Sequence, residues 1–177
     1  MKQTIFSAII IALHILIVAD PPTISLEERI FLNKHKTFIV GQDSEWAPIE
    51  YADPDGKFKG IASDYLEEIS RYLNIQIKSA GILSWDTILK DTQAKKIDII
   101  SGVAYTPERE SFLTFTKPYL TIQNVIFTRL DVHYIGNLEE LNGMKVAVVE
   151  GYLIGELIKR NHPKIELIPV HSAKEGL

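Results

Sequence analysis

The sequence contains no cysteine. This absence excludes disulfide bonds, thiolate metal sites, a cysteine nucleophile and a lipid anchor on an N-terminal cysteine. The formal net charge is −4 and no run of Lys or Arg marks a basic surface, so nothing indicates nucleic-acid binding. The longest apolar run, residues 5–19, is shorter than the roughly 20 residues that a membrane-spanning helix needs.

The motifs of common catalytic and metal sites are also missing. The five histidines are scattered without metal-ligand spacing, and no Gly-x-Ser-x-Gly elbow or phosphate loop occurs. Asp98 is either a general base or a structural carboxylate, and its place at the start of a predicted strand favours the structural role. We therefore expect no enzyme activity within these residues, no cofactor and no bound metal.

The composition is that of an ordinary globular protein. Of 177 residues, 46% are hydrophobic and 24% are charged, which is enough to bury a core. The length fits one domain or two small ones.

The N-terminal segment, residues 1–19, predicts a secretory signal peptide. Lys2 precedes the apolar run, which ends at Asp20-Pro21-Pro22, and cleavage is expected near Ala19. Ile17 is bulky for a residue three positions before the cut, so an uncleaved membrane anchor remains the alternative. Both alternatives place the rest of the chain in the periplasm or another extracytoplasmic space.

The stretch from Asp98 to Tyr119 carries the most information about function. A short buried strand, residues 97–100, ends in two small residues, where a backbone can approach a ligand closely. Thr106-Pro107-Glu108 then predicts a helix start, whose free N–H groups favour an anion. Arg109 adds a guanidinium fork that can bind a carboxylate in two places, although it can equally be a solvated helix charge.

Two motifs in this stretch extend the argument. The pattern Asp-x-Ile-x-Gly-x-x-x-Thr-Pro-Glu-Arg, followed by Phe-Thr-x-Pro-Tyr, resembles the signature of family 3 periplasmic solute-binding proteins. The resemblance runs from about Leu26 to Leu177 and implies an α/β fold of two lobes with doubly wound, mostly parallel sheets, the "Venus flytrap". It implies that Arg109 holds the carboxylate of a ligand. It further implies the ligand-binding residues Asp43, Trp46, Trp85, Ser101, Gly102, Ala104, Tyr105, Thr106, Arg109, Gly151 and Tyr152.

Some of these residues have a structural alternative. Trp46 and Trp85 can each be core side chains instead of walls of the pocket. Members of the family that bind amino acids carry hydroxyl residues where this chain has Ala104 and, nearby, Leu153. The expected ligand is therefore a small anionic or zwitterionic molecule, an amino acid or another organic acid.

Periodicity and caps divide the chain into segments. Residues 20–36 form a lead-in, whose helix 26–32 has Ser25 and Glu28 as a capping box. Residues 37–130 form lobe 1 and residues 131–177 begin lobe 2. Strands are predicted at 38–41, 75–78, 97–100, 121–129, 145–149 and 165–168, and helices at 64–73 and after Ser84, Asn137 and Tyr152.

Lobe 2 is predicted to be incomplete. Ser172 and Glu175 resemble a capping box, but no helix follows, so we expect the chain to be the N-terminal part of a longer protein. The apolar faces of Val146, Val148 and Leu167 are then expected to be exposed.

Four functions are compatible with this resemblance, three non-catalytic and one enzymatic. The lead-in helix resembles that of flytrap domains in sensor kinases and diguanylate cyclases, which favours the sensory input of a membrane signalling protein. The alternatives are a soluble substrate receptor of an ABC-type amino-acid transporter and the non-catalytic N-terminal domain of a peptidoglycan lytic transglycosylase. An exported cyclic-acid dehydratase is the enzymatic rival within the same fold.

Overall fold

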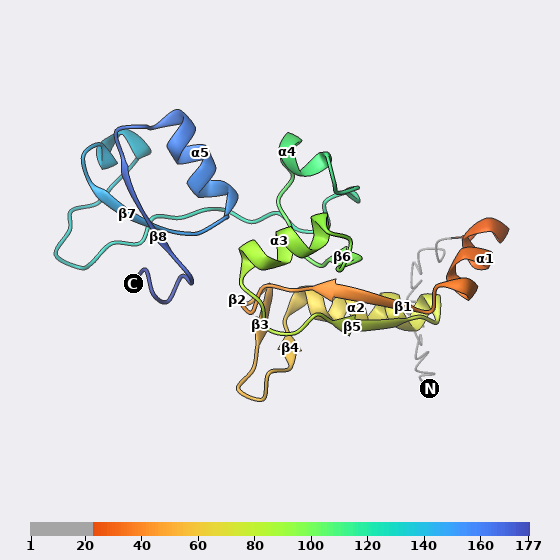
Figure 1. Cartoon of the computed structure of the whole chain (residues 1–177). Coiled ribbons are helices and arrows are strands. Elements are labelled where there is room, and N and C mark those ends of the chain that lie inside the picture. The colour runs from red at the N-terminus through yellow and green to blue at the C-terminus, as the bar shows by residue number, and fades with distance from the viewer. Residues whose placement is uncertain (1–22) are drawn as a thin grey trace, which may run out of the picture.

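The computed structural model describes residues 23–177 and contains two α/β parts joined by a long connection (Figure 1). The predicted signal peptide lies outside the described residues. The first part contains α1 (Leu26–Lys34), β1 (Thr37–Gly41), β2 (Glu45–Trp46), β3 (Glu50–Ala52), β4 (Phe58–Lys59), α2 (Ile61–Leu73), β5 (Gln76–Ser79), α3 (Trp85–Gln93), β6 (Ile99–Ile100) and α4 (Pro107–Glu110). The second part contains the 3₁₀ helix η1 (Leu138–Leu141), β7 (Lys145–Val149), α5 (Leu153–Asn161) and β8 (Glu166–Val170).

The sheet of lobe 1 is parallel, as predicted, with the strand order β5-β1-β6. The chain moves from β1 to β5 on one side and then across to β6 on the other, so the winding reverses at β1. Strand β6 is shorter than the predicted 97–100, because Asp98 accepts a hydrogen bond from the backbone N–H of Ile39 at 2.8 Å through its side chain. This contact confirms that Asp98 is structural. Val40, Ile88 and Ile97 are buried in this region.

A three-stranded antiparallel sheet, β2-β3-β4, follows β1. Its tight turn is stabilised by Asp53, whose carboxylate accepts hydrogen bonds from the backbone N–H groups of Asp55 and Lys57. Helix α2 begins at Ile61, three residues before the predicted start. The prediction missed this start because the residue before the helix, Gly60, has no side chain that could cap it. The sequence pattern used for helix starts relies on such caps.

Helix α1 has the predicted capping box. Ser25 accepts a hydrogen bond from the backbone N–H of Glu28, and the Glu28 carboxylate accepts one from the N–H of Ser25. None of its residues is buried, and Figure 1 shows the helix standing away from lobe 2 beside the N-terminal end of β1.

The connection between the lobes differs from the prediction. Residues 121–129 are extended in sequence pattern, but they form no strand, and all of them are exposed. A strand needs a hydrogen-bonded neighbour, and no described strand pairs with this segment. The predicted strand 121–129 is therefore wrong for the described chain.

Lobe 2 contains two parallel strands, β7 and β8, with Lys145 opposite Glu166. Leu141, Ile158 and Ile165 form its buried core. The sequence predicts that the side chains of Val146, Val148 and Leu167 are exposed. This prediction is wrong, because all three are partly buried against the core cluster. On the other face of β7, Lys145 and Ala147 are exposed, so this strand is half-buried. Over residues 23–177, no helix combines the length and apolar character that crossing a bilayer requires.

Candidate functional site

The site lies at the carboxyl ends of β1 and β6, where the winding of the sheet reverses. Gly41 and Ile100 are opposite each other at the ends of these strands. Open α/β sheets bind ligands in the crevice formed at such a reversal. The loops that leave the two strands carry Asp43 on one side and Ser101-Gly102 on the other, and the corner after β7 faces them from lobe 2.

A cavity of about 1180 Å³ extends from this crevice. Its lining includes nine of the eleven residues that the sequence predicts, namely Asp43, Trp46, Trp85, Ser101, Gly102, Ala104, Tyr105, Arg109 and Tyr152. Thr106 is instead buried beneath the helix start, and Gly151 reaches the site through its backbone carbonyl. The structure thus brings nine of the predicted residues to one cavity, and their role in ligand binding stays a prediction.

Arg109 is held in place by the short helix α4. Thr106 caps this helix by accepting a hydrogen bond from the backbone N–H of Arg109 at 3.2 Å, and Pro107 occupies the first helical position. The Arg109 side chain is only 6% exposed, so it is not the solvated helix charge that the sequence left open. Burial lowers the pKa of its guanidinium, with the carboxylate of Glu156 acting in the opposite direction. A guanidinium stays protonated under such a shift and remains a donor.

The guanidinium of Arg109 is engaged from both lobes. Nη1 donates to the carbonyl oxygen of Ala104 at 3.0 Å, and Nη2 donates to that of Gly151 at 2.9 Å. Nη2 also lies 3.6 Å from the carboxylate of Glu156 on α5. No sequence pattern singles out Glu156, because it lies in a surface position of an amphipathic helix.

The two tryptophans of the chain both lie at the site. Trp46 packs over Gly102, where an added Cβ would lie 3.1 Å from the indole Cζ3 atom. Trp85 donates from Nε1 to the carbonyl oxygen of Gly151 at 3.1 Å. Neither indole is fully buried, so both are walls of the crevice and not core side chains.

Tyr152 lies between these indoles. Its ring centroid is 6.2 Å from that of Trp46 and 6.2 Å from that of Trp85, with edge-to-face geometry in both pairs. Its hydroxyl donates a hydrogen bond to Oδ2 of Asp43. Burial raises the pKa of Tyr152 well above its ordinary value, and the hydrogen bond to the Asp43 carboxylate acts in the same direction. The phenol therefore stays protonated and remains a donor.

A buried carboxyl group, Glu50, supports the floor of the site and was missed by the sequence analysis. Its side chain is fully buried and accepts hydrogen bonds from the backbone N–H of Asp43 at 2.9 Å and from the hydroxyl of Ser101. Burial raises the pKa of Glu50 to about 7. The one feature of the sequence that could have indicated a buried acid is the position of Glu50 between two apolar residues, Ile49 and Tyr51.

The remaining predicted residues have more local roles. Tyr105 is 55% exposed, donates from its hydroxyl to Glu110 at 2.8 Å and contacts the ring of Phe115. The carbonyl oxygen of Ser101 accepts a hydrogen bond from the hydroxyl of Tyr119 at 2.8 Å, which fixes the strand end. Among the described residues, no three His, Asp or Glu side chains gather as a metal ion would need.

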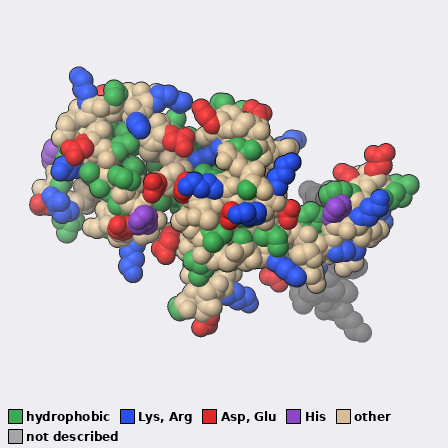
Figure 2. Space-filling model, viewed as in Figure 1, with side chains coloured by type: hydrophobic (Ala, Val, Ile, Leu, Met, Phe, Trp, Pro, Cys, Tyr) green, Lys and Arg blue, Asp and Glu red, His purple; other side chains and the backbone are tan. Residues whose placement is uncertain are grey.

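The surface around the site carries charges of both signs. Figure 2 shows Lys and Arg side chains interspersed with Asp and Glu over both lobes in that view, without a large area of one sign.

Comparisons with known proteins agree with this architecture. The chain is similar to a probable amino-acid ABC transporter-binding protein of Haemophilus influenzae, with 29% identity over 117 residues that cover 66% of the chain and 45% of the relative. It is also similar to the virulence sensor protein BvgS of Bordetella pertussis, with 23% identity over 156 residues that cover 88% of the chain and 13% of the relative. The chain thus spans about half or less of the length of these relatives.

Solved structures show the same fold. An ancestral amino acid-binding protein, a precursor of cyclohexadienyl dehydratase, superposes with a TM-score of 0.74 at 28% identity and covers 84% of this chain and 66% of that one. The periplasmic domain of B. pertussis BvgS superposes with a TM-score of 0.77 at 23% identity and covers 88% of this chain and 30% of that one, which shows the fold alone.

A family profile matches most of the chain. The match covers residues 38–169, from the first strand of lobe 1 into the last strand of lobe 2. The chain therefore belongs to the bacterial extracellular solute-binding proteins, family 3.

Proposed function

We propose that the chain is an exported, periplasmic solute-binding domain that captures a small anionic or zwitterionic ligand, such as an amino acid, between its two lobes. The observation that carries this proposal is the buried guanidinium of Arg109, placed at a helix start and at the junction of the lobes. A cation buried at a cleft favours an anionic partner because desolvation strengthens the interaction between opposite charges. The tryptophan walls supply apolar contact area for the rest of the ligand.

We further propose that the domain acts as the sensory input of a membrane signalling protein. A matched stretch of 156 residues in a chain of 177 begins no later than residue 22, so the similarity to the sensor BvgS includes the whole of α1. The match to the Haemophilus transporter-binding protein covers only 117 residues. A lead-in helix shared with a sensor supports this role.

A substrate receptor for an ABC-type transporter is the second candidate. It is favoured by similarity to several binding proteins, among them a probable histidine-binding protein of Neisseria gonorrhoeae with 28% identity over 140 residues. No catalytic role is proposed, since Asp98 serves the sheet and the two buried acids, Asp43 and Glu50, are hydrogen-bonded within the crevice.

Ligand binding can be tested by thermal unfolding against the twenty L-amino acids and a set of small organic acids. A solute at about a hundred times its Kd stabilises the native state by about 2.7 kcal/mol, which corresponds to a rise in Tm of roughly 5–10 °C for a chain of this size. A panel in which no member raises the Tm would contradict the proposal.

Arg109→Ala tests the role of the guanidinium. Calorimetry with the solute that raises the Tm should show an affinity at least about thirtyfold weaker, as expected for removing one partner of a buried charge pair. Arg71→Ala is the matched control, because its side chain is 77% exposed on α2. Equal affinities of Arg109→Ala and the unmodified chain would show that the ligand binds elsewhere.

A further inference from the structure

The corner formed by Gly151 and Tyr152, at the end of β7, enters the crevice of lobe 1 and contacts four of its residues. The carbonyl oxygen of Gly151 accepts hydrogen bonds from Trp85 and Arg109. Tyr152 donates a hydrogen bond to Asp43, and its ring contacts the rings of Trp46 and Trp85. This dipeptide supplies the hydrogen bonds that hold lobe 2 against lobe 1, and Glu156 of α5 adds an ion pair with Arg109 at 3.6 Å.

These contacts use Nη2 of Arg109, which the proposed function assigns to a ligand, and the carboxylate of Asp43, which the family resemblance implies as ligand-binding. The Gly151 carbonyl takes the place of an anionic oxygen on Nη2 of Arg109, at 2.9 Å. The Tyr152 hydroxyl takes the place of a ligand donor on the Asp43 carboxylate, whose other oxygen accepts from the backbone N–H of Glu45 at 2.9 Å. Every buried side-chain N or O atom in the described part of the chain has a hydrogen-bond partner.

Backbone conformation explains why a glycine stands at this corner. Gly151 has φ +76°, in the left-handed region that favours glycine. A Cβ at this position would also lie 2.9 Å from Cδ1 of Trp85. The absence of a side chain therefore lets the carbonyl reach two donors of the opposite lobe at once.

We propose that the Gly151-Tyr152 corner is a built-in competitor of the ligand, which closes the cleft by itself and must be displaced before a solute can bind. This proposal depends on the proposed function for the identity of the binding atoms, but the closure is a property of the chain alone. Three hydrogen bonds hold the lobes together: Arg109 and Trp85 each donate one to the Gly151 carbonyl, and Tyr152 donates one to the Asp43 carboxylate. The carboxylate of Glu156, 3.6 Å from Nη2 of Arg109, adds an ion pair. The strength of these contacts sets the affinity threshold that a ligand must exceed.

Tyr152→Phe is the sharpest test, because it removes the hydroxyl and leaves the ring between the tryptophans. Losing a hydrogen bond to an ionised carboxylate should raise the population of the open form about tenfold or more. Both tryptophans of the chain touch Tyr152, so acrylamide quenching of tryptophan fluorescence, in buffer without added solute, should become stronger in the variant. Tyr134→Phe is the control, since Tyr134 is 88% exposed and lies outside the cavity lining.

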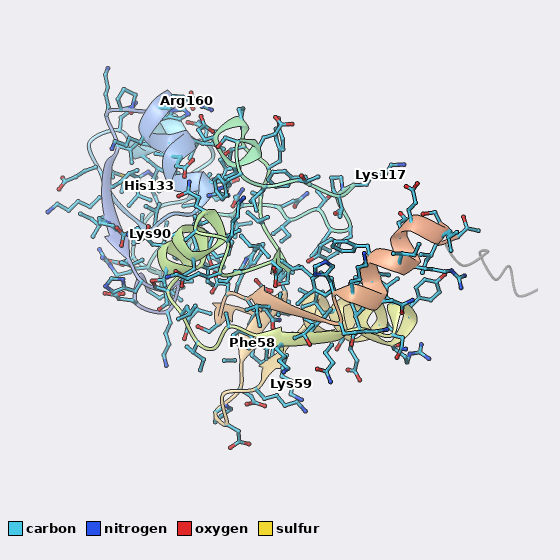
Figure 3. All side chains as sticks on the ribbon, turned by 45° about the vertical axis from the view of Figure 1, so that its right-hand side comes forward. Phe58, Lys59, Lys90, Lys117, His133 and Arg160 are labelled. Atoms are coloured by element: carbon cyan, nitrogen blue, oxygen red, sulfur yellow. The ribbon has the colours of Figure 1, made fainter. Side chains whose placement is uncertain are left out.

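Distance measurements give an independent readout. The chain has no cysteine, so spin labels can be attached at only two introduced sites, Lys59→Cys on β4 and Lys159→Cys on α5. Figure 3 shows Lys59 on the hairpin of lobe 1 and Arg160, the neighbour of Lys159, on α5 at the other end of the molecule. The expected result is a single distance in the parent chain and an added longer one after Tyr152→Phe, with far-ultraviolet circular dichroism unchanged.

The outcomes separate this proposal from the proposed function. Unchanged quenching and unchanged distances after Tyr152→Phe would overturn the competitor role, whether or not an amino acid binds. Opening of the variant supports it, even if no solute in the panel raises the Tm. Where a solute does bind, Tyr152→Phe should bind it about tenfold more tightly, and weaker binding would overturn the proposal by making Tyr152 a ligand contact.

Discussion

Replacing Glu50 with Gln should change the pH dependence of stability more than stability itself. The Glu50 side chain is fully buried, and it receives hydrogen bonds from the backbone N–H of Asp43 and the hydroxyl of Ser101. Burial raises its pKa from 4.5 to about 7 in the folded chain. Gln has nearly the same shape but cannot ionise.

The direction of the pH dependence follows from the protonation of Glu50 in the folded and the unfolded chain. Below pH 4.5 the carboxyl group is protonated in both the folded and the unfolded chain, so it causes no pH dependence. Between pH 4.5 and about 7 the unfolded chain has released this proton while the folded chain retains it, so the stability falls as the pH rises. A shift of this size corresponds to a total loss of about 3 kcal/mol, which is complete above the folded pKa.

Urea unfolding of both proteins from pH 4 to pH 8 measures this loss. The free energy of unfolding of the parent chain minus that of Glu50→Gln should fall by about 3 kcal/mol across the window, because all other titrating groups cancel in the difference. Glu67→Gln, on the exposed surface of α2, controls for the change of side-chain type. A difference that stays flat over the window would refute the buried-carboxyl argument.

Two further substitutions test the packing of lobe 1, both by urea unfolding. Ile88→Ala should lower the free energy of unfolding by about 2–5 kcal/mol, because Ile88 is 0% exposed and its removal leaves a cavity under β1; a loss below about 1 kcal/mol would contradict that placement. Gly60→Ala should lower it by at least about 1 kcal/mol, because Gly60 has φ +107° and an added Cβ would lie 2.6 Å from the carbonyl oxygen of Ile49. A neutral Gly60→Ala would show that the hairpin and α2 are not joined as described.

The sequence predicted local features of the fold well because their causes are local. Ser25, Ser84, Thr106 and Asn137 were each expected to cap a helix, and each side chain accepts the expected backbone hydrogen bond. A cap depends only on residues within one turn. The strand predicted at 121–129 failed because pairing depends on a distant segment, which no local pattern can provide.

In the candidate site, too, features with local causes could be predicted and contacts between distant residues could not. Arg109 and the helix start that positions it were predictable, since Thr106 and Pro107 are its immediate neighbours. The role of Glu50 was not, because its partner Ser101 lies 51 residues away in the chain. The contact between Asp43 and Tyr152 spans 109 residues and depends on how the lobes meet, so no spacing in the sequence indicates it.

Small residues at the strand ends explain why a ligand site and a self-contact occupy the same place. The sequence predicts that another group can approach the backbone closely at Gly102, and the structure shows the same at Gly151. In the structure, Trp46 packs on Gly102 and Trp85 packs on Gly151. A strand end without a side chain accepts whichever group the opposite wall presents, whether it belongs to a solute or to the chain. The contact of Trp46 with Gly102 lies within lobe 1, whereas that of Trp85 with Gly151 joins the two lobes. The cleft can therefore bind its own opposite wall at Gly151, and ligand binding becomes an exchange of partners at Arg109 and Asp43.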